Sequence, residues 1–466
     1  MRFRVEEIEV REENPFLNDS LNRKPVVELL RDLVCRLDGP FVLAIDSPWG
    51  TGKTTVVRML RSLLKIDGCA SVYFNAWKED YVTDPLVPMV VALDDLSLSE
   101  GLAGSGFGDK MAKVKEVATK VAKRGIFAAV KLGTMGVLDL EEVAEDVIST
   151  VAVESADDVV SAFRSEKQSL ESFRDALATA VSVAGGETDP KPLVFFVDEL
   201  DRCRPTFAIE LLERIKHLFD VKGLIFVLSV DKRQLEAITA AVYGERIDAR
   251  EYLRRFIDLD LSLPLGSGKV YARSLIERHG LKRIFDERMQ HSSSFSYDYS
   301  SVVDSFAEFS RALRMSLRQM DRCFTRLALV LMRTPSNYYL DPHPVVFLII
   351  VRSIRPDLYA SFAEGDLSPR DLVDEVARIS APRVVETSRR FIVVEAYLIA
   401  GDFDSERRKV TIRSMEEVSS DENREGWFRA KEVLSMMRHV RGNGLRDFSS
   451  RYLLEKIDLA SALADD

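Results

Sequence analysis

A glycine-rich stretch between a predicted strand and a predicted helix constrains the fold of this chain most. The stretch DSPWGTGKTT covers residues 46–55. It ends the apolar, β-rich run FVLAID (41–46) and leads into KTTVVRMLRSLLK (53–65), where apolar residues recur at helical spacing. A buried strand, a glycine loop and a helix in this order are the context of a phosphate-binding loop. The alternative is an ordinary strand-to-helix turn in which Gly-Lys-Thr occurs by chance.

The loop departs from the phosphate-loop pattern G-x-x-x-x-G-K-[ST] at one position. Gly52, Lys53 and Thr54 fit the end of the pattern, whereas Ser47 replaces its first glycine. Because Ser47 precedes Pro48, its backbone is already biased toward an extended conformation that does not require glycine. We therefore expect the loop to bind phosphate despite the replacement, although weaker binding is an open alternative.

Each residue type in the loop has a defined task in a phosphate site. Backbone N–H groups converge on phosphate oxygens, and the positive end of the following helix adds to the attraction. Lys53 is expected to reach the β- and γ-phosphates as a catalytic cation, and the Thr54 hydroxyl is expected to bind Mg²⁺. The predicted nucleotide contacts come from Pro48, Trp49, Gly50, Thr51, Gly52, Lys53, Thr54 and Thr55.

Further apolar runs predict a sheet around this loop. They cover residues 70–74, 193–197, 223–230 and 256–264, and helical patterns separate them. Strands that are continuous apolar runs and alternate with helices form a parallel sheet covered on both faces. The predicted fold class is α/β, a P-loop type of parallel sheet with helices on both faces, followed by a mainly helical C-terminal domain.

Changes in pattern along the chain predict three parts. Residues 1–85 and 166–265 are expected to form the nucleotide-binding core, and residues 86–165, rich in Gly, Ala and Lys, a mainly helical insertion within it. Residues 266–466 are expected to form a helical lid or C-terminal domain, because strong strands cease there and helical periodicity dominates.

The insertion contains a lysine-rich segment, residues 109–133, that has two interpretations. It is either a packed helix with a solvated lysine face or a basic amphipathic helix on an anionic membrane surface. No apolar run reaches the roughly 18 residues that span a bilayer. The start of the chain is charged and shows no signal peptide, so we expect a cytoplasmic protein without membrane spans.

Charge and cysteine content set further expectations. The chain has 65 Lys and Arg against 75 Asp and Glu, a net charge of −10. This balance gives no whole-protein reason to expect nucleic acid, although a local basic patch stays open. The four cysteines, Cys35, Cys69, Cys203 and Cys323, are scattered with neither paired nor metal-binding spacing, which suits a reducing cytosol.

A second motif places acids at the end of a strand. In LVFFVDELDRC (193–203), Asp198 is expected to hold Mg²⁺, usually through water. Glu199 is then placed as general base on the attacking water. The alternative is that both acids only cap the helix that begins near Pro205.

The next predicted strand ends in two further polar residues, Ser229 and Asp231. They fall at the ligand-facing end of such a sheet, where Ser229 can contact the γ-phosphate or the water. The alternative is a simple strand terminus. We expect the loop at 47–54 and the acids at 198–199 to meet across adjacent strands around a magnesium-bound triphosphate.

Several segments together resemble the KAP-type P-loop NTPases, a group related to the AAA and STAND ATPases. The resemblance rests on SPWGTGKTT, VYFNAWKED, VFFVDELDRC and EYLRRFIDLDLSLP, which span roughly the first 265 residues. Its most distinctive features are Asn75 and Trp77 in FNAW, and Asp201-Arg202-Cys203 after the second acid. The combination is far more specific than any one motif.

The resemblance implies an Mg²⁺-dependent ATPase that works as a regulatory switch. It implies a homo-oligomer as well, and bacterial antiviral defence with a protein effector encoded nearby as one setting. The choice of ATP over GTP rests on this likeness alone. The chain departs from the group at Ser47, where glycine is usual, and at Glu199, where aspartate is frequent. Glutamate is the commoner base in related hydrolases, so the second departure does not argue against turnover.

Four arginines lie where the resemblance implies roles. Arg254 and Arg255 precede the strand FIDLDL, where a neighbouring subunit's finger for the γ-phosphate is found in related ATPases. The alternative is that they pair with nearby acids such as Glu251. Arg318, in SLRQMDR, resembles a lid arginine that reports which nucleotide is bound. Arg23, in DSLNRKP, lies where such proteins close over the adenine.

Three other functions stay open at this point. One is a nucleotide-gated scaffold with little turnover, and another is a nucleic-acid-stimulated motor. The third is a membrane-surface organiser that acts through residues 109–133. No nuclease, protease or deaminase signature indicates that this chain is its own effector.

Overall fold

The computed structural model of the chain contains two compact units. One spans Ile8–Pro264 and the other contains Leu265–Asp466. The structure describes residues 9–98, 102, 105–123, 156–186, 190–264, 266–291, 298–338, 340–379, 388–442 and 449–458.

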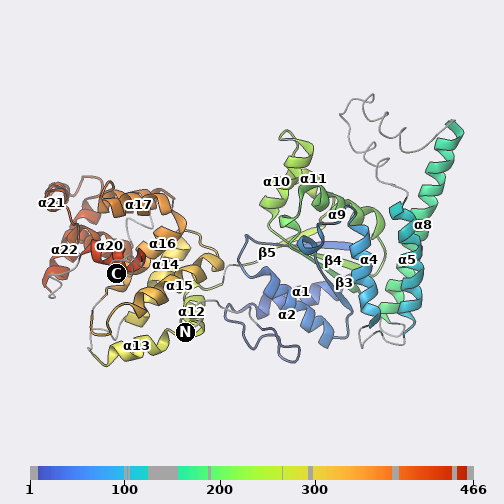
Figure 1. The fold of residues 1–466 in the computed structure, drawn as a ribbon, viewed down its shortest axis with the longest axis horizontal. Helices are drawn as coiled ribbons and strands as arrows, with labels where there is room; N and C mark the ends of the chain where they lie inside the picture. The colour runs from blue at the N-terminus through green and yellow to red at the C-terminus, as the bar shows by residue number, and fades with distance from the viewer. Residues whose placement is uncertain are drawn as a thin grey trace, which may run out of the picture. The chain divides into compact units, whose positions relative to one another are not determined.

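The first unit is built on a five-stranded parallel sheet with the strand order β2-β3-β4-β1-β5 (Figure 1). This confirms the predicted α/β fold with its parallel sheet. The three inner strands run in the order β3, β4, β1, and every residue of β3 and β4 is buried. The strands are β1 (Phe41–Asp46), β2 (Ser71–Asn75), β3 (Leu193–Asp198), β4 (Leu224–Val230) and β5 (Leu259–Ser262).

The strand order corrects one expectation. The phosphate loop follows β1 and the acids follow β3, but these strands are not adjacent, because β4 lies between them. The register nevertheless brings their ends level: Asp46 pairs with Val230, and Asp198 pairs with Ser229. The loop and the acids therefore meet across one intervening strand.

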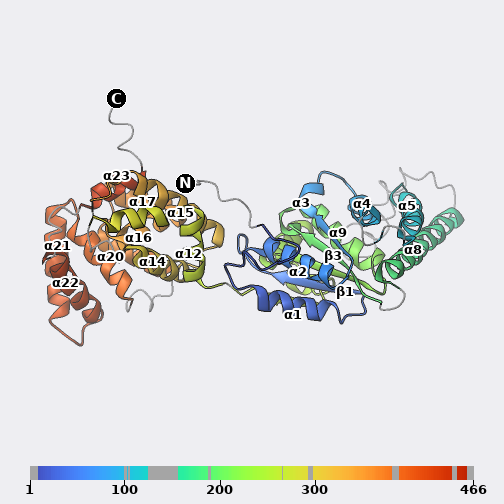
Figure 2. The same ribbon diagram turned by 90° about the horizontal axis from the view of Figure 1, so that it is seen from below.

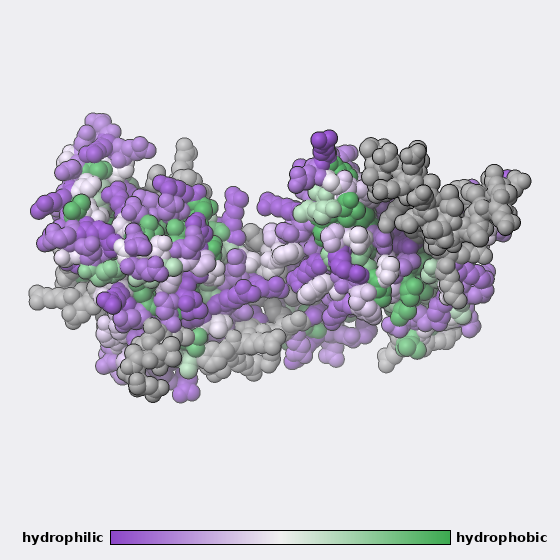
Figure 3. Space-filling view, turned by 45° about the horizontal axis from the view of Figure 1, so that its top comes forward, coloured by the Kyte–Doolittle hydropathy of each residue, from purple (hydrophilic) through white to green (hydrophobic). Residues whose placement is uncertain are grey.

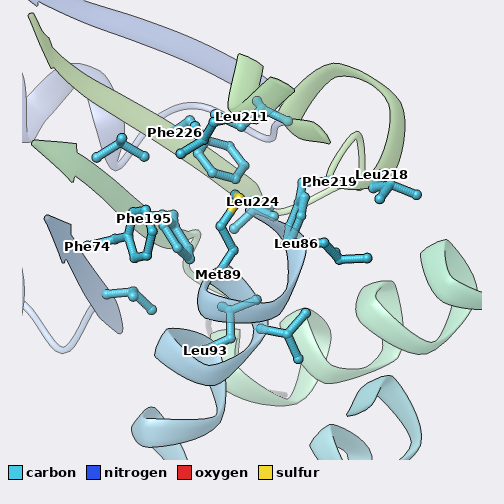
Figure 4. Close-up of a cluster of buried hydrophobic side chains, with 14 of the residues drawn as sticks. Phe74, Leu86, Met89, Leu93, Phe195, Leu211, Leu218, Phe219, Leu224 and Phe226 are labelled. Atoms are coloured by element: carbon cyan, nitrogen blue, oxygen red, sulfur yellow. The ribbon is translucent and has the colours of Figure 1, made fainter. Parts of the chain in front are cut away.

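Helices cover both faces of the sheet (Figure 2). On one face, α1 (Lys24–Val34) and α2 (Lys53–Ile66) pack against alternate strand residues such as Phe196 and Val227. On the other face, α4 (Leu86–Asp94) and α9 (Pro205–Leu218) pack against the intervening strand residues, such as Phe195 and Phe226. Figure 4 shows Leu86, Met89 and Leu93 of α4 beside Phe74, Phe195 and Phe226 of the strands.

The described part of the expected insertion consists of helices that join this core. Helix α5 (Phe107–Lys123) packs against α8 (Ala156–Gly185), and its apolar residues Met111, Val114 and Val121 are buried. The packed-helix interpretation therefore holds for residues 109–123, since the apolar face is covered. Residues 124–133 of the lysine-rich segment lie outside the described residues.

Five further helical elements complete the described part of the first unit. They are α3 (Ala76–Glu79), the 3-10 turns η1 (Asp95–Leu98) and η2 (Leu200–Arg202), α10 (Lys232–Tyr243) and α11 (Ala249–Leu253).

The described residues of the second unit contain helices and no strand, as predicted for the C-terminal region. Its centre is α16 (Pro342–Ile354), in which Val345 to Val351 are all buried. The other helices are α12 (Gly268–Arg278), α13 (Lys282–Met289), α14 (Asp298–Ala312), α15 (Leu317–Met332), α17 (Pro356–Glu364), α18 (Pro369–Ile379), α20 (Arg389–Ala400), α21 (Ser405–Ser419), α22 (Trp427–Gly442) and α23 (Ser450–Asp458).

The visible surface is mostly hydrophilic, with hydrophobic residues in small groups (Figure 3). Among the helices that the structure describes, none combines the length and the apolar character that crossing a bilayer requires.

Candidate functional site

The loop after β1 has the backbone that an anion site needs. Gly50 and Gly52 have φ values of 77° and 91°, in the left-handed region where a side chain would be strained. Ser47 has a negative φ, and its N–H donates to the carbonyl oxygen of Val230 at 3.1 Å. The serine therefore costs no backbone strain at the position where the pattern has glycine. Helix α2 begins at Lys53, so its N-terminal N–H groups point toward the loop.

The side chain of Lys53 is buried and held by carbonyl oxygens of the loop itself. Its Nζ donates to the carbonyl oxygens of Ser47 and Pro48. Burial lowers the pKa of Lys53, while the carboxylates of Asp201, Asp231 and Asp198 act in the opposite direction. An ammonium group already inside the loop can exchange carbonyl oxygens for phosphate oxygens with little rearrangement.

The first acid of the second motif lies directly against the loop. The Thr54 hydroxyl donates to Asp198 Oδ2 at 2.8 Å, and the Tyr73 hydroxyl donates to the same oxygen at 3.0 Å. The N–H of Glu199 donates to the other oxygen, Oδ1, at 3.0 Å. Three donors therefore orient this buried carboxylate. A hydroxyl and a carboxylate side by side are hard oxygen donors of the kind that Mg²⁺ takes beside substrate phosphates, so the residues fit that ion.

The second acid, Glu199, is held by two partners from the distinctive sequence segments. Its Oε2 accepts from Asn75 Nδ2 at 2.9 Å, and its Oε1 pairs with Arg202 Nη1 at 2.7 Å. Glu199 has a φ of 60°, in the left-handed region that non-glycine residues rarely adopt. Such strain costs about 1–3 kcal/mol and is found where surrounding contacts fix a functional residue.

A second network joins the phosphate loop to the strand ends. Trp49 of the loop donates its indole N–H to Asp201 Oδ2, which also accepts from the N–H of Asp231 at 2.9 Å. Asp201 is only 4% exposed; burial raises its pKa, and the charge of Lys53 opposes that shift. Asp201 therefore fixes the loop to the end of β4 through two hydrogen bonds.

Arg202 lies between two tryptophans. Its guanidinium carbon is 5.9 Å from the ring centre of Trp49 and 5.5 Å from that of Trp77, within the range of cation–π attraction. The same guanidinium pairs with Glu199. No role was predicted for Asn75, Trp77, Asp201 or Arg202, although the segments FNAW and DRC marked them as distinctive. In the structure Asn75 and Arg202 bind Glu199, Trp77 contacts Arg202, and Asp201 binds Trp49 of the loop.

Ser229 lies at the end of β4, in register with Asp198. Ser229 is 1% exposed, and its hydroxyl has no hydrogen-bond partner among the described residues. The hydroxyl of Ser47 is likewise buried without a hydrogen-bond partner among those residues. A buried hydroxyl without a partner costs roughly 1–3 kcal/mol. A ligand or water at the site would satisfy it.

The expected arginines are in different environments. Arg23 is 3% exposed and donates to the carbonyl oxygens of Thr51, at 3.1 Å, and of Pro264. It therefore binds the backbone of the phosphate loop, and its expected role at the adenine stays a prediction.

Arg254 and Arg255 are exposed. Arg254 pairs with Glu251 at 2.7 Å, and Arg255 lies over the ring of Tyr252 at 5.8 Å. Arg318 is exposed near the start of α15 in the second unit. Their finger and lid roles stay predictions.

Comparison with protein-family models gives one match, which is described as the KAP family P-loop domain and covers residues 23–332. No curated protein shows significant sequence similarity to the chain.

Proposed function

The chain belongs to the KAP family of P-loop NTPases, and from this membership and the geometry of its site we propose that it binds and hydrolyses Mg²⁺–ATP as a regulatory switch. The observation that carries the proposal is the hydrogen bond from Thr54 to Asp198 at 2.8 Å. It joins the phosphate loop to the acidic motif at the position where a nucleotide and its metal are expected.

The binding step relies on groups that are already in place. The N–H groups from Gly50 to Thr54 and the ammonium of Lys53 would bind the phosphates. Thr54 and Asp198 would hold Mg²⁺, which neutralises charge on the β- and γ-phosphates when it is bound. Asp198 keeps its orientation through Tyr73 and the N–H of Glu199.

The hydrolytic step falls to Glu199. It follows Asp198 directly, and Asn75 and Arg202 fix both oxygens of its carboxylate. A carboxylate so fixed can accept a proton from the attacking water within hydrogen-bond distance. Ser229, whose buried hydroxyl has no partner among the described residues, supports a polar contact with the γ-phosphate or the water.

Contacts of the loop with its surroundings support the switch. Arg23 joins the carbonyl of Thr51 to that of Pro264, the last residue of the first unit. A change in the loop on loss of the γ-phosphate would therefore reach the segment that leads to the helical unit. A ligand shifts such an equilibrium only through contacts that differ between the two states, and we assign that part to these two carbonyl bonds.

The wider setting follows from the family. Arg254 and Arg255 are exposed, as a finger that reaches a neighbouring copy must be. We therefore include in the proposal a homo-oligomer, an arginine supplied between subunits, and a protein effector, with antiviral defence in bacteria as the setting. Arg318 would report the bound nucleotide from the helical unit.

Calorimetry tests the binding step of the proposal, and phosphate release tests the hydrolytic step. Titration of the purified chain with ATP in the presence of Mg²⁺ should give a saturable heat, and chelation of the metal should weaken it. GTP in the same titration decides the base preference. Absence of any heat of binding with both nucleotides would overturn the proposal.

A nucleotide-gated scaffold with little turnover is the second candidate, and one observation favours it. Both oxygens of Glu199 already accept hydrogen bonds, from Asn75 and Arg202. Each oxygen keeps a second acceptor site, but the two partners restrict the directions from which a water can approach it. Tight binding of Mg²⁺–ATP with no phosphate release above background, even at high protein concentration, would favour the scaffold.

A further inference from the structure

Two of the four cysteines lie side by side in the first unit. Cys35 follows α1 and Cys69 precedes β2, and their Sγ atoms are 3.7 Å apart. All four cysteines are free thiols, and their scattered spacing in sequence did not indicate this contact. Their separation in sequence concealed the contact, because it arises only when α1 packs beside α2 on the sheet.

Neighbouring contacts hold both thiols in place. Arg31 of α1 pairs with Asp67 at 3.0 Å, and the Nζ of Lys191 donates to the carbonyl oxygen of Asp67. The N–H of Cys35 donates to the carbonyl of Arg31 at 2.9 Å, and that of Cys69 donates to Leu64 at 2.8 Å. The backbones that carry the two sulfurs are thus held by hydrogen bonds, and the sulfurs must approach from 3.7 Å to about 2.05 Å to form a bond.

We propose that Cys35 and Cys69 are a redox-reactive thiol pair, a modification site at which a peroxide closes an intramolecular disulfide. The two residues differ in their access to an oxidant. Cys35 is partly exposed, so an oxidant can reach it, whereas Cys69 is 5% exposed. Burial, together with the neighbouring Cys35 thiol, raises the pKa of Cys69 to about 12. Cys35 is therefore the first to react, and Cys69 is the resolving thiol.

The reaction balances with hydrogen peroxide as the oxidant. The sulfur of Cys35 attacks one peroxide oxygen, the O–O bond breaks, and sulfenic acid and water form. The sulfur of Cys69 then attacks the sulfenic sulfur, the S–O bond breaks, and the hydroxyl leaves as a second water with the thiol proton. Two thiols lose two electrons and two protons in total, and one peroxide is reduced to two waters.

The disulfide would close a loop of chain that contains the phosphate-binding segment. The chain between the two cysteines contains β1, the phosphate loop and all of α2. Closing this loop restricts the unfolded chain, so oxidation should raise the melting temperature of the first unit by about 5 °C or more. Because no phosphate-binding residue is modified, the affinity for Mg²⁺–ATP should change little.

Thiol titration and peptide mapping test the proposal. The reduced wild-type chain, denatured, should titrate as four thiols. After brief treatment of the folded chain with hydrogen peroxide, two thiols should remain, and non-reducing mass spectrometry should find Cys35 joined to Cys69. Cys203→Ser and Cys323→Ser should still lose two thiols. Cys35→Ser and Cys69→Ser should form no intramolecular disulfide.

Two results would overturn the proposal. One is that all four thiols of the treated wild-type chain survive oxidation while a small peptide dithiol in the same tube is oxidised. The other is that the linked peptides contain Cys203 or Cys323, or join two chains. None of these readouts depends on nucleotide, so the outcome is independent of the function proposed above.

Discussion

The hydroxyl of Thr54 and the carboxylate of Asp198 are 2.8 Å apart, although strand β4 separates the strands that precede them. The level ends of the three parallel strands bring the two residues together, since Asp46 pairs with Val230 and Asp198 with Ser229. A loop that binds phosphate and an acid that binds metal thereby share one edge of the sheet.

Removal of the loop lysine should weaken nucleotide binding. Lys53→Ala removes an ammonium group that would make charged hydrogen bonds to phosphate, each worth about 1.5–3 kcal/mol. The Kd for Mg²⁺–ATP should therefore rise by about 10-fold to 150-fold. Isothermal calorimetry measures it. The matched control is Lys65→Ala in the same helix, because Lys65 is exposed and pairs with Glu12, away from the loop. Equal affinities for the two variants would contradict the assignment.

Replacement of the proposed base should separate hydrolysis from binding. Glu199→Gln keeps the size of the side chain and can still accept from Asn75, but it can no longer take a proton from water. Loss of a general base costs typically 10²-fold to 10⁴-fold, so kcat should fall by about that range while the Kd for Mg²⁺–ATP stays nearly constant. Phosphate release under steady-state conditions measures the change.

The control for this variant is Glu116→Gln, which alters an exposed glutamate paired with Lys120 on α5. Its rate should equal that of the wild type. If the wild type and Glu199→Gln release phosphate at the same measurable rate, Glu199 is not the base. If neither exceeds background while both bind, the scaffold is the better description.

Trp49 should report occupation of the loop. The chain has three tryptophans, and in a Trp427→Phe background only Trp49 and Trp77 remain. Trp49 donates to Asp201 and contacts Arg202, so a phosphate that moves the loop should change the emission of this indole. Fluorescence titration with Mg²⁺–ATP measures the change. It should persist after Trp77→Phe, disappear after Trp49→Phe, and shift to higher ATP concentration after Lys53→Ala; an equal change without Trp49 would contradict the prediction.

Apolar patterning was enough to predict the inner strands of the sheet. The runs that became β1, β3 and β4 are continuous because both faces of these strands are covered, and burial of that kind is visible in sequence. The edge strand β5 covers residues 259–262 of the predicted range 256–264, and Leu259, Asp260 and Ser262 in it are exposed.

Contacts between distant segments could not be predicted. The order of strands, the pairing of Asn75 with Glu199, and the meeting of Cys35 with Cys69 depend on register and helix packing across the whole unit. No local pattern carries that information. Trp49 and Trp77 could be recognised as motif residues, but their common contact with Arg202 could not be predicted.

An arginine supplied by a neighbouring subunit should be detectable by mixing variants. If Arg254 or Arg255 acts on the γ-phosphate of another copy, its replacement by alanine should lower kcat by about 10³-fold. Mixing that variant with Glu199→Gln should then restore part of the activity, since some sites would combine an intact base with an intact finger. The control is Arg250→Ala, exposed on the same short helix. Failure of every mixture to recover activity would contradict a finger in trans.

Stability of the helical unit should fall as pH rises through neutrality because of Asp298. This carboxyl is 5% exposed, and burial raises its pKa from 3.8 to about 7. The charge of Arg288, 3.7 Å away, lowers the pKa, and the charge of Asp341 raises it further. The folded state therefore binds the proton more tightly than the unfolded state. The stabilisation is complete below about pH 4, is lost as pH rises toward 7, and has an upper limit of ~4 kcal/mol.

The variant Asp298→Asn isolates this contribution, because asparagine resembles the protonated carboxyl at every pH. The free energy of unfolding of the variant, compared with that of the wild type, should increase by roughly 2–3 kcal/mol when the pH is raised from 5 to 8. That increase corresponds to the part of the Asp298 titration that falls in this range. Denaturant unfolding followed by circular dichroism at the two pH values measures the difference. Asp286→Asn, at an exposed carboxylate on α13, is the control and should show no such gain. A difference between Asp298→Asn and the wild type that is the same at both pH values would show that Asp298 does not titrate in this range.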